Sequence, residues 1–584
     1  MPFNEYYQEE LAYLREMGEV FSRAYPKLAP FLADKGNDPD VERLMEGFAF
    51  IAGRIRQKLD DQLPELTHGL HSLLWPNLLR PIPSASILQF MPLPGAVSEK
   101  QTITRGVEID SKPVDGTPCR FKTCYDVDIY PISLTGVGLK RTGPTTQLEL
   151  QFQLHEGAAI DKIEMDSLRF FLNGDLQTCF TLYSYFFRHL TGITVKGSEK
   201  DDTLQLRPDV VRAGGFADDE ELVPYPANAF IGYRLLQEYF SLPQKFLFLE
   251  LAGLRPLSRL PIKNKFSITF EFDRRIDDRV RLSKSSILLY CTPIVNLFSK
   301  DADPIRIEHN KDEYRVRPSA SEPSHFEIYS IDRVEGWSYG DRKKLSYAPF
   351  ASFDRGTSVV DEGYNYYRIR LRPSVVGMGV DTFLSFESHG EKGVAPQVVT
   401  VSSELTCTNN RLPEKLRIGD ISIQTGSSPE FAEFKNVLPV TVSTPPPLES
   451  DLHWQLISNM ALNYLSLADV QALRVVLSTY NFPAFYDRQA ERAHELRMDG
   501  LSGITLEPTT MMFKGLPVRG YKIFLGMKSG NFSSEGEMYL FATILNEFFS
   551  LYASINSFIQ LIVRDIDRGD VYQWTPRIGQ QPLL

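Results

Sequence analysis

Apolar side chains recur at steps of three and four residues over the first part of the chain, in two separate sets. Such spacing predicts an amphipathic helix, and two sets predict two apolar faces. A helix at the surface of its own domain needs only one apolar face, so we expect this helix to be interior or shared in a bundle. Pro26 is expected to end it. The first set is Tyr7, Leu11, Leu14, Gly18 and Phe21, and the second is Tyr13, Met17, Val20 and Ala24.

A second helix is predicted to begin at Asp38-Pro39, because an acceptor side chain at the N-cap is followed by proline at the first helical position. Pro64 is expected to end this helix after about 25 residues, or roughly 37 Å of rod. A third helical stretch is expected from Glu65 to Trp75, before several prolines force an extended exit. The apolar positions of the second helix are Val41, Leu44, Phe48, Ile51, Ile55 and Leu59.

The spacing changes to a period of two between about residues 87 and 442. Apolar and polar residues alternate over Leu148–Leu154, Phe266–Phe272 and Tyr367–Arg372. This alternation predicts half-buried strands in antiparallel sheets that have one solvent-exposed face. One amphipathic segment, Leu176–Leu190, is predicted to be a helix. The region is too long for a single sandwich, so we divide it near Leu297–Pro304 into two β-rich lobes.

Helical spacing resumes after the stiff joint Pro445–Pro447, first over Leu452–Tyr464 and again after Asp469. Ser534–Glu537 is expected to cap a last long helix, and Phe558–Arg564 is expected to be a strand. The fold class is therefore α+β and multidomain, with a long-helix bundle segment, two antiparallel β-rich lobes and a C-terminal α+β domain. The expected limits are 1–84 for the helical segment, 85–300 and 301–444 for the two lobes, and 445–584 for the C-terminal domain.

Composition narrows the class of protein. The chain has 584 residues with 63 Lys and Arg against 74 Asp and Glu, a formal net charge of −11. Net acidity without a basic cluster argues against a nucleic-acid binder. Its apolar runs fall far short of the roughly 18 residues of a membrane-spanning helix, and we expect no secretory signal. Five scattered cysteines form no disulfide framework, which favours a reducing cytoplasm.

Candidate chemistry is sparse. His68 and His71 have a spacing that two metal ligands could use, but no third ligand with a recognised spacing follows, so a structural role is favoured. Cys119 and Cys124 lack a second pair downstream. Arg568-Gly569-Asp570 is expected to be a turn after a strand. No Gly-x-Ser-x-Gly elbow occurs. We therefore expect no catalytic residues, no bound cofactor and no metal site.

Several of the segments discussed above resemble one known family. The chain is similar in order, spacing and total length to the TssF family, also called ImpG or VasA, and the likeness spans the whole chain, although the middle lobes carry few distinctive motifs. The similar segments are Tyr6–Arg15, Asp38–Phe50, Lys58–Asp61, Leu79–Ser84, Trp454–Asn459, Leu462–Leu467 and Leu551–Phe558.

The resemblance implies a structural, non-enzymatic baseplate subunit of the bacterial type VI secretion system, a cytoplasmic, phage-tail-like contractile injection machine. It implies wedges of two TssF copies with one TssG, whose helices form a trimeric core bundle, and a baseplate docked on an inner-membrane-anchored complex. Further implied partners are TssE, TssK, the VgrG spike, and sheath and tube proteins, with no nucleic acid and no direct membrane insertion. The residues expected at the bundle interface are Tyr7, Leu11, Leu14, Phe21, Val41, Leu44, Phe48, Ile51 and Ile55.

A rival class remains open on the residues alone. A multidomain β-rich carbohydrate-active enzyme or glycan-binding protein would also explain the abundant strands and the 26 tyrosines. Such an enzyme needs two inward carboxylates about 5–10 Å apart in an aromatic-lined cleft. It should behave as a self-sufficient monomer or simple oligomer, whereas a wedge subunit should become tractable only when it is expressed with its partner.

Overall fold

A computed structural model describes most of the chain as two compact units. The first unit comprises residues 1–74 with 448–457, and the second comprises 75–447 with 458–584. The described residues are 3–24, 39–197, 203–226, 231–307, 311–338, 344–350, 365–374, 379–388, 399–448, 450–460, 469–513, 515–550, 553 and 557–579.

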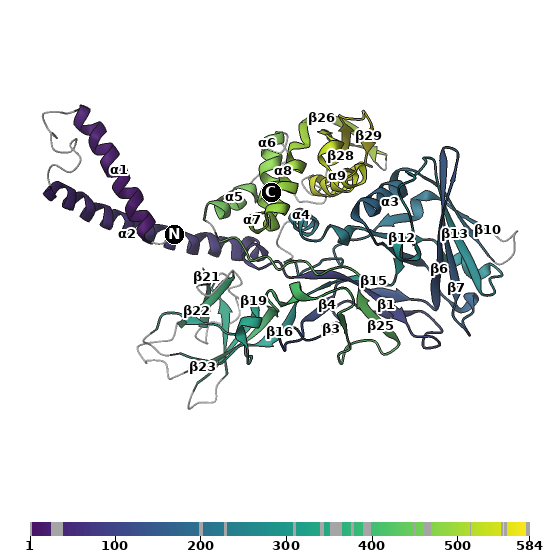
Figure 1. Cartoon of the computed structure of the whole chain (residues 1–584), viewed down its shortest axis with the longest axis horizontal. Coiled ribbons are helices and arrows are strands. Elements are labelled where there is room, and N and C mark those ends of the chain that lie inside the picture. The colour runs from purple at the N-terminus through teal and green to yellow at the C-terminus, as the bar shows by residue number, and fades with distance from the viewer. Residues whose placement is uncertain are drawn as a thin grey trace. The chain divides into compact units, whose positions relative to one another are not determined.

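The first unit is a helical hairpin. Helix α1 spans Phe3–Ala24, helix α2 spans Pro39–Leu74, and α1 folds back along α2 (Figure 1). Helix α5, Ser450–Met460, contributes its first turns to the same unit. The sequence correctly predicted helices that start near these positions.

The expected end of the second helix was wrong. Helix α2 runs through Pro64 to Leu74, a continuous 36 residues, so the expected third helix is its C-terminal part. At 1.5 Å per residue the rod is about 54 Å long. Proline removes one main-chain N–H, which costs one hydrogen bond and can be tolerated when the turns on both sides continue.

The first β-rich lobe of the second unit contains the strands that the period of two predicted. Strands β7 (Thr145–Leu154) and β13 (Lys265–Phe272) pair antiparallel, with Phe152 opposite Phe266 and their ring centroids 4.9 Å apart. Helix α3, Leu176–Arg188, confirms the predicted amphipathic helix, and Asp175 caps it by accepting from the Thr178 N–H. The five-stranded sheet has the order β10 (Thr203–Leu206), β9 (Leu190–Lys196), β13 (Lys265–Phe272), β7 (Thr145–Leu154) and β6 (Ile132–Thr142).

Two further sheets belong to this lobe. One has the order β11 (Val211–Ala213), β12 (Phe248–Ala252), β8 (Ser167–Leu172) and β14 (Ile287–Leu289), and helix α4 (Ile231–Ser241) precedes β12. A small sheet pairs β2 (Gln101–Ile103) with β5 (Val127–Ile129).

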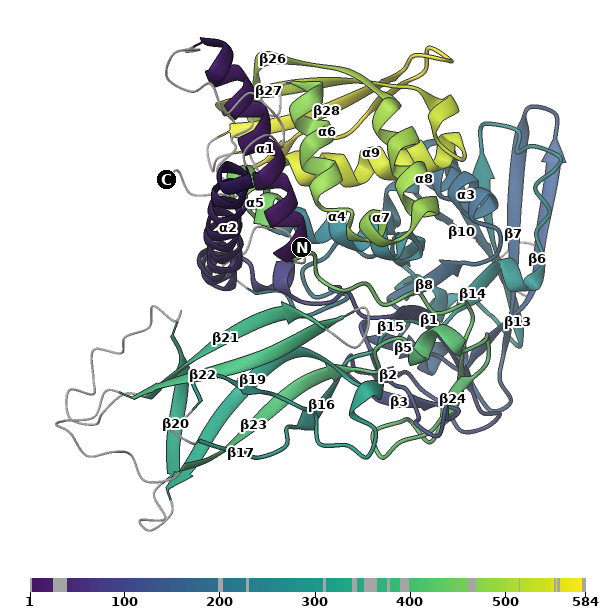
Figure 2. The same ribbon diagram turned by 60° about the vertical axis from the view of Figure 1, so that its left-hand side comes forward.

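The second β-rich lobe has a core of its own. Its strands form one sheet, drawn in teal and green (Figures 1 and 2). The core is made of buried side chains from residues 298 to 407, among them Val334, Leu384 and Leu405. The strand order is β16 (Phe298–Asp301), β23 (Val399–Thr408), β19 (Glu327–Ser338), β20 (Lys344–Pro349), β21 (Asn365–Pro373), β22 (Val380–Ser388) and β18 (Tyr314–Arg315), with β17 (Ile305–Arg306) on β23.

The chain then returns to the first lobe and adds two strands to one of its sheets. Main-chain pairing joins Leu88 to Asn436 and Ser111 to Ile421, so these late strands complete a sheet begun more than 300 residues earlier. Such long-range pairing leaves no local signal in the sequence. The four expected domain limits stay a prediction. The sheet has the order β24 (Ile421–Ile423), β3 (Glu108–Ser111), β4 (Arg120–Thr123), β15 (Cys291–Val295), β1 (Ala85–Pro92) and β25 (Ala432–Asn436).

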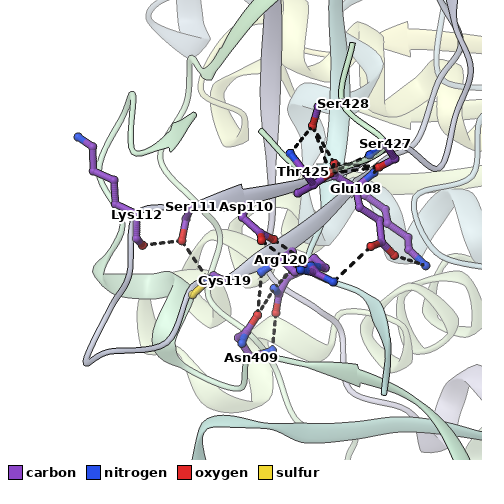
Figure 3. Close-up of polar contacts among 12 residues, drawn as sticks. Glu108, Asp110, Ser111, Lys112, Cys119, Arg120, Asn409, Thr425, Ser427 and Ser428 are labelled. Atoms are coloured by element: carbon purple, nitrogen blue, oxygen red, sulfur yellow. Dashed lines mark hydrogen bonds and ion pairs between the residues drawn. The ribbon is translucent and has the colours of Figure 1, made fainter. Parts of the chain in front are cut away.

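A polar junction ties the end of β23 to this sheet (Figure 3). The Asn409 carboxamide oxygen accepts from the Arg120 main-chain N–H at 3.0 Å and from the Asn296 side chain at 2.8 Å. The Arg120 guanidinium forms a two-bond contact with Asp110, at 2.9 and 3.1 Å. The side chains of Thr425 and neighbouring serines donate to the Glu108 carbonyl. These contacts fix the end of β23 to the sheet, so the junction is a structural brace.

The C-terminal part is α+β, as predicted. Helix α9, Glu535–Ser550, is capped as expected: the Glu537 N–H donates to the Ser534 hydroxyl at 3.1 Å, and the Glu537 carboxylate accepts from the Ser533 N–H at 2.7 Å. The predicted late strand is β28. The sheet order is β26 (Leu501–Phe513), β27 (Leu516–Met527), β28 (Ser557–Asp565) and β29 (Val571–Gln573), with β30 (Arg577–Ile578) on β28, and α6 (Val470–Thr479), α7 (Phe482–Tyr486) and α8 (Arg488–Asp499) precede it.

A candidate assembly surface on the helical hairpin

Small residues on α2 make the contact between the two long helices. Ala49 is fully buried and Gly53, one turn further along, is buried as well. A Cβ atom at Gly53 would lie 3.2 Å from the main-chain nitrogen of Tyr7 and 3.3 Å from the carbonyl carbon of Tyr6. The backbones of α1 and α2 therefore approach closely where α2 carries little or no side chain.

The opposite face of α2 carries large apolar side chains that are more than half exposed. Leu44 is 74% exposed, Phe48 61%, Ile51 58% and Ile55 56%. Their steps of four, three and four residues place them on one stripe, about half a turn away from Ala49 and Gly53. We call these four residues the α2 stripe.

Helix α1 also presents exposed apolar side chains. Tyr13 and Met17, four residues apart, belong to the second of its two predicted faces and are both exposed. Tyr7, Leu11 and Leu14, from the first predicted face, are half-buried. The hairpin thus keeps apolar surface on both of its helices, as the double spacing in the sequence indicated.

The predicted interface residues fall into three groups. The α2 stripe is exposed, the three α1 residues Tyr7, Leu11 and Leu14 are half-buried, and the side chains of Phe21 and Val41 lie outside the described residues. Their contact with another chain stays a prediction.

Burial of the α2 stripe by another chain would contribute substantial free energy to association. Full burial of a Leu, Ile or Phe side chain is worth about 1.5–3 kcal/mol. Because each stripe residue is more than half exposed, about 1–2 kcal/mol per side chain remains available, or about 4–8 kcal/mol for the four together. An apolar surface of this kind is typical of a protein–protein interface.

A histidine cluster holds α5 against the C-terminal part of α2. The His71 Nε2 atom lies 3.1 Å from the His453 carbonyl oxygen, and the rings of His68 and His71 lie 4.9 and 4.8 Å from that of His453. Burial, and then the nearby His453, lower the pKa of His71 to about 4. The sequence identified the first two histidines, but His453 is 382 positions from His71 and no local pattern connects them. In the described part of the chain, no group of three or more His, Cys, Asp or Glu side chains is arranged to hold a metal ion.

The cysteines are buried free thiols. Burial raises the pKa of Cys119 to about 12 and raises that of Cys124 further, so both are protonated at neutral pH. Protonated, buried thiols are poor nucleophiles and poor metal ligands.

The Arg568-Gly569-Asp570 tripeptide forms the predicted turn after β28. Gly569 has φ +79°, and the Asp565 N–H donates to the Asp570 carbonyl at 2.9 Å. The Arg568 guanidinium donates to Glu535 at 2.6 Å. The Arg568 side chain of the motif is therefore hydrogen-bonded within the fold.

Comparison with known proteins covers the whole chain. The model of the family described as "Type VI secretion system, TssF" matches residues 2–581. The type VI secretion system component TssF1 of Pseudomonas aeruginosa is 30% identical over 99% of both chains. A chain in the cryo-electron microscopy structure of a TssK-TssF-TssG baseplate subcomplex superposes with a TM-score of 0.76 at 29% identity, covering 92% of this chain and 99% of that one. A chain in a structure of the baseplate complex from the type VI secretion system gives 0.61 at 26% identity, with full coverage of both.

These matches define the class of the protein as a component of type VI secretion systems. Within that class, the chain belongs to the TssF family. The family resemblance predicted from the helical segments and the C-terminal part is confirmed. Among the described helices, none is both long and apolar enough to cross a membrane.

Proposed function

We propose that this protein is a structural baseplate subunit of a type VI secretion system and that it works through assembly and not through catalysis. The observation that supports this most directly is the α2 stripe, in which four large apolar side chains are more than half exposed. A stripe with this spacing fits into the packed seam of a helical bundle. The solved relatives in TssK-TssF-TssG and baseplate complexes support the same role.

The proposed main partner is TssG, with two copies of this chain for each TssG. The helices of the two copies and of TssG would bury the α2 stripe and the apolar face of α1, with Tyr7, Leu11, Leu14, Phe21 and Val41 contributing to the same bundle. TssK, TssE, the VgrG spike and the sheath and tube proteins are proposed as further neighbours in the wedge. We place this assembly in the cytoplasm, docked on an inner-membrane-anchored complex.

Co-expression tests the proposal. The chain is produced alone, with TssG, and with TssG and TssK, and the mass of each purified particle is measured. We expect a stable complex that contains two copies of this chain for each TssG, and a lower yield of soluble chain when it is produced alone. A single monodisperse chain that is indifferent to both partners would contradict the proposal and revive the class of self-sufficient enzymes.

Hydrogen exchange locates the contact within that complex. The segment 4–79 should exchange more slowly in the complex than in the free chain, because its exposed apolar faces become buried. Equal exchange in both states would show that the hairpin is not the interface, even if a complex forms.

A further inference from the structure

Asn173 and Gly174 connect strand β8 to helix α3, and Asn173 is the one asparagine of the chain that is followed by glycine. In such a pair the main-chain nitrogen of the glycine can attack the side-chain carboxamide carbon of the asparagine, because glycine has no side chain to obstruct the approach. The carboxamide nitrogen leaves as ammonia, together with the proton of the glycine N–H, and a succinimide ring closes. Water then opens the ring to aspartate or to isoaspartate, in which the main chain runs through the former side chain.

The attacking nitrogen is accessible in the folded chain. Gly174 is exposed, and a Cβ atom placed on it would meet no atom within 4 Å. Its N–H donates to no acceptor among the residues that the structure describes. Gly174 has φ +130°, a conformation that residues with a side chain rarely adopt. No neighbouring segment therefore has to move away from the glycine before the ring can close.

Two hydrogen bonds restrain Asn173. Its main-chain N–H donates to the Ser286 carbonyl and its side-chain Nδ2 donates to the Ser285 carbonyl, both at 2.9 Å. The side-chain bond holds the carboxamide that the Gly174 nitrogen would attack. Because this bond is exposed to solvent, water competes for both of its groups and its net contribution is small. We therefore expect it to slow the reaction without preventing it.

Either product disturbs the start of α3. Aspartate at position 173 replaces the Nδ2 donor with a carboxylate, which can only accept, opposite the Ser285 carbonyl oxygen. Isoaspartate adds one methylene to the main chain just before Asp175. The Asp175 carboxylate caps α3 by accepting from the Thr178 N–H at 3.1 Å, so a displaced Asp175 loses the cap.

The first turns of α3 lie against the start of α9 (Figure 1). The Gln177 side-chain Nε2 donates to the Ser533 carbonyl at 3.1 Å. A Cβ atom at Gly536 would collide with the Phe180 carbonyl, so the two backbones touch where α9 has no side chain. A contact this close depends on the position of α3, and loss of the α3 cap would loosen it.

We propose that Asn173 is a deamidation site of the folded chain, and that its isoaspartate product loosens the first turn of α3 from α9. The reaction requires only water and the chain itself, so it is independent of the proposed assembly. It is a slow, irreversible change that accumulates as the protein ages.

The test incubates the full chain at pH 7, 8 and 9. Modification is followed by peptide mass spectrometry, with protein isoaspartyl methyltransferase as the probe for isoaspartate. We expect Asn173 to react at least about tenfold faster than any other asparagine, because no other is followed by glycine. Its rate should rise with pH, since the attacking nitrogen must lose its proton.

The same chain unfolded in urea gives the rate without the restraint of the fold. We expect the folded chain to react within about tenfold of that rate, since one exposed hydrogen bond holds the carboxamide. Amide exchange over residues 176–188 reports on α3. It should be faster in the aged wild-type chain than in the fresh one, and the melting temperature should be lower.

Two variants control the experiment. Asn173→Gln keeps an amide, but its side chain would have to close a six-membered ring, which forms far more slowly, so position 173 should stay unmodified and exchange over 176–188 should not change with age. Asn173→Asp reproduces the direct product. It should have a lower melting temperature than the fresh wild type, in the same direction as the aged chain.

Two outcomes would overturn the proposal. One is a folded chain in which Asn173 stays intact while the urea-unfolded chain is converted, which would show that the fold protects this site. The other is complete modification at position 173 with unchanged exchange over residues 176–188, which would refute the effect on α3.

Discussion

A charge placed on the α2 stripe should abolish assembly while leaving the chain folded. The changes are Phe48→Asp and Ile55→Asp, seven residues apart on one stripe. In the isolated chain these side chains are 61% and 56% exposed, so an Asp there remains largely in water. The cost to the fold is then mainly the lower helix propensity of Asp, about 0.7 kcal/mol or less.

The same carboxylate within a bundle seam is far more costly. An unpaired buried charge costs several kcal/mol after relaxation, and the lost burial of Phe or Ile adds about 1–2 kcal/mol. A total of about 4 kcal/mol or more weakens association by roughly a thousandfold, since each 1.4 kcal/mol is a factor of ten. The experiment therefore compares the small cost of Asp to the fold of the isolated chain with its large cost to association.

The assay combines copurification with circular dichroism. Each variant is co-expressed with TssG, and its stoichiometry in the purified material is compared with that of the wild type. We expect both variants to lose TssG while keeping helix and strand signals, and Phe48→Leu, which adds no charge, to bind nearly normally. Normal copurification of both Asp variants would show that this stripe is not the interface. Precipitation with loss of all secondary structure would assign the stripe to the core of the chain itself.

Three further predictions concern stability. Gly47→Ala should raise the melting temperature, because a Cβ at Gly47 meets no atom within 4 Å and Ala is favoured over Gly in a helix by about 1 kcal/mol. Gly53→Ala should gain less stability or lose some, because its Cβ would lie 3.2 Å from the α1 backbone. Equal shifts in the melting temperatures of the two variants would contradict the close approach of the helices. The folded-state pKa of His71 is about 4, below the unfolded value of about 6.5, so the unfolded state binds more protons between these two pH values. Up to about 3 kcal/mol of folding stability is therefore lost as the pH falls from 6.5 toward 4. Thermal unfolding between pH 7 and 5 should show this loss, and the loss should be smaller in His71→Gln. Lys245→Met should cost about 3–5 kcal/mol in chemical denaturation, because it removes the ammonium group that pairs with the buried Glu238, and adding Glu238→Gln should recover part of that loss.

The sequence by itself determined the local elements and the apolar stripe on α2. Spacings of three and four placed α1, α2 and α3, and a period of two placed β7 and β13, because a helix or strand that buries one face must repeat apolar residues at its own period. The α2 stripe could be named in advance for the same reason. Its large side chains remain on one face whichever chain covers them.

Only the tertiary structure decided which groups from distant parts of the chain come together. Strands β24 and β25 complete a sheet with β1 and β3, and His453 joins His68 and His71, although hundreds of residues separate these partners. Pro64 is a local stop signal that the long helix overrides, since one missing hydrogen bond weighs little against intact turns on both sides. The sequence also could not show that Gly53 lies against the α1 backbone, because only the close approach of two backbones gives a glycine that role.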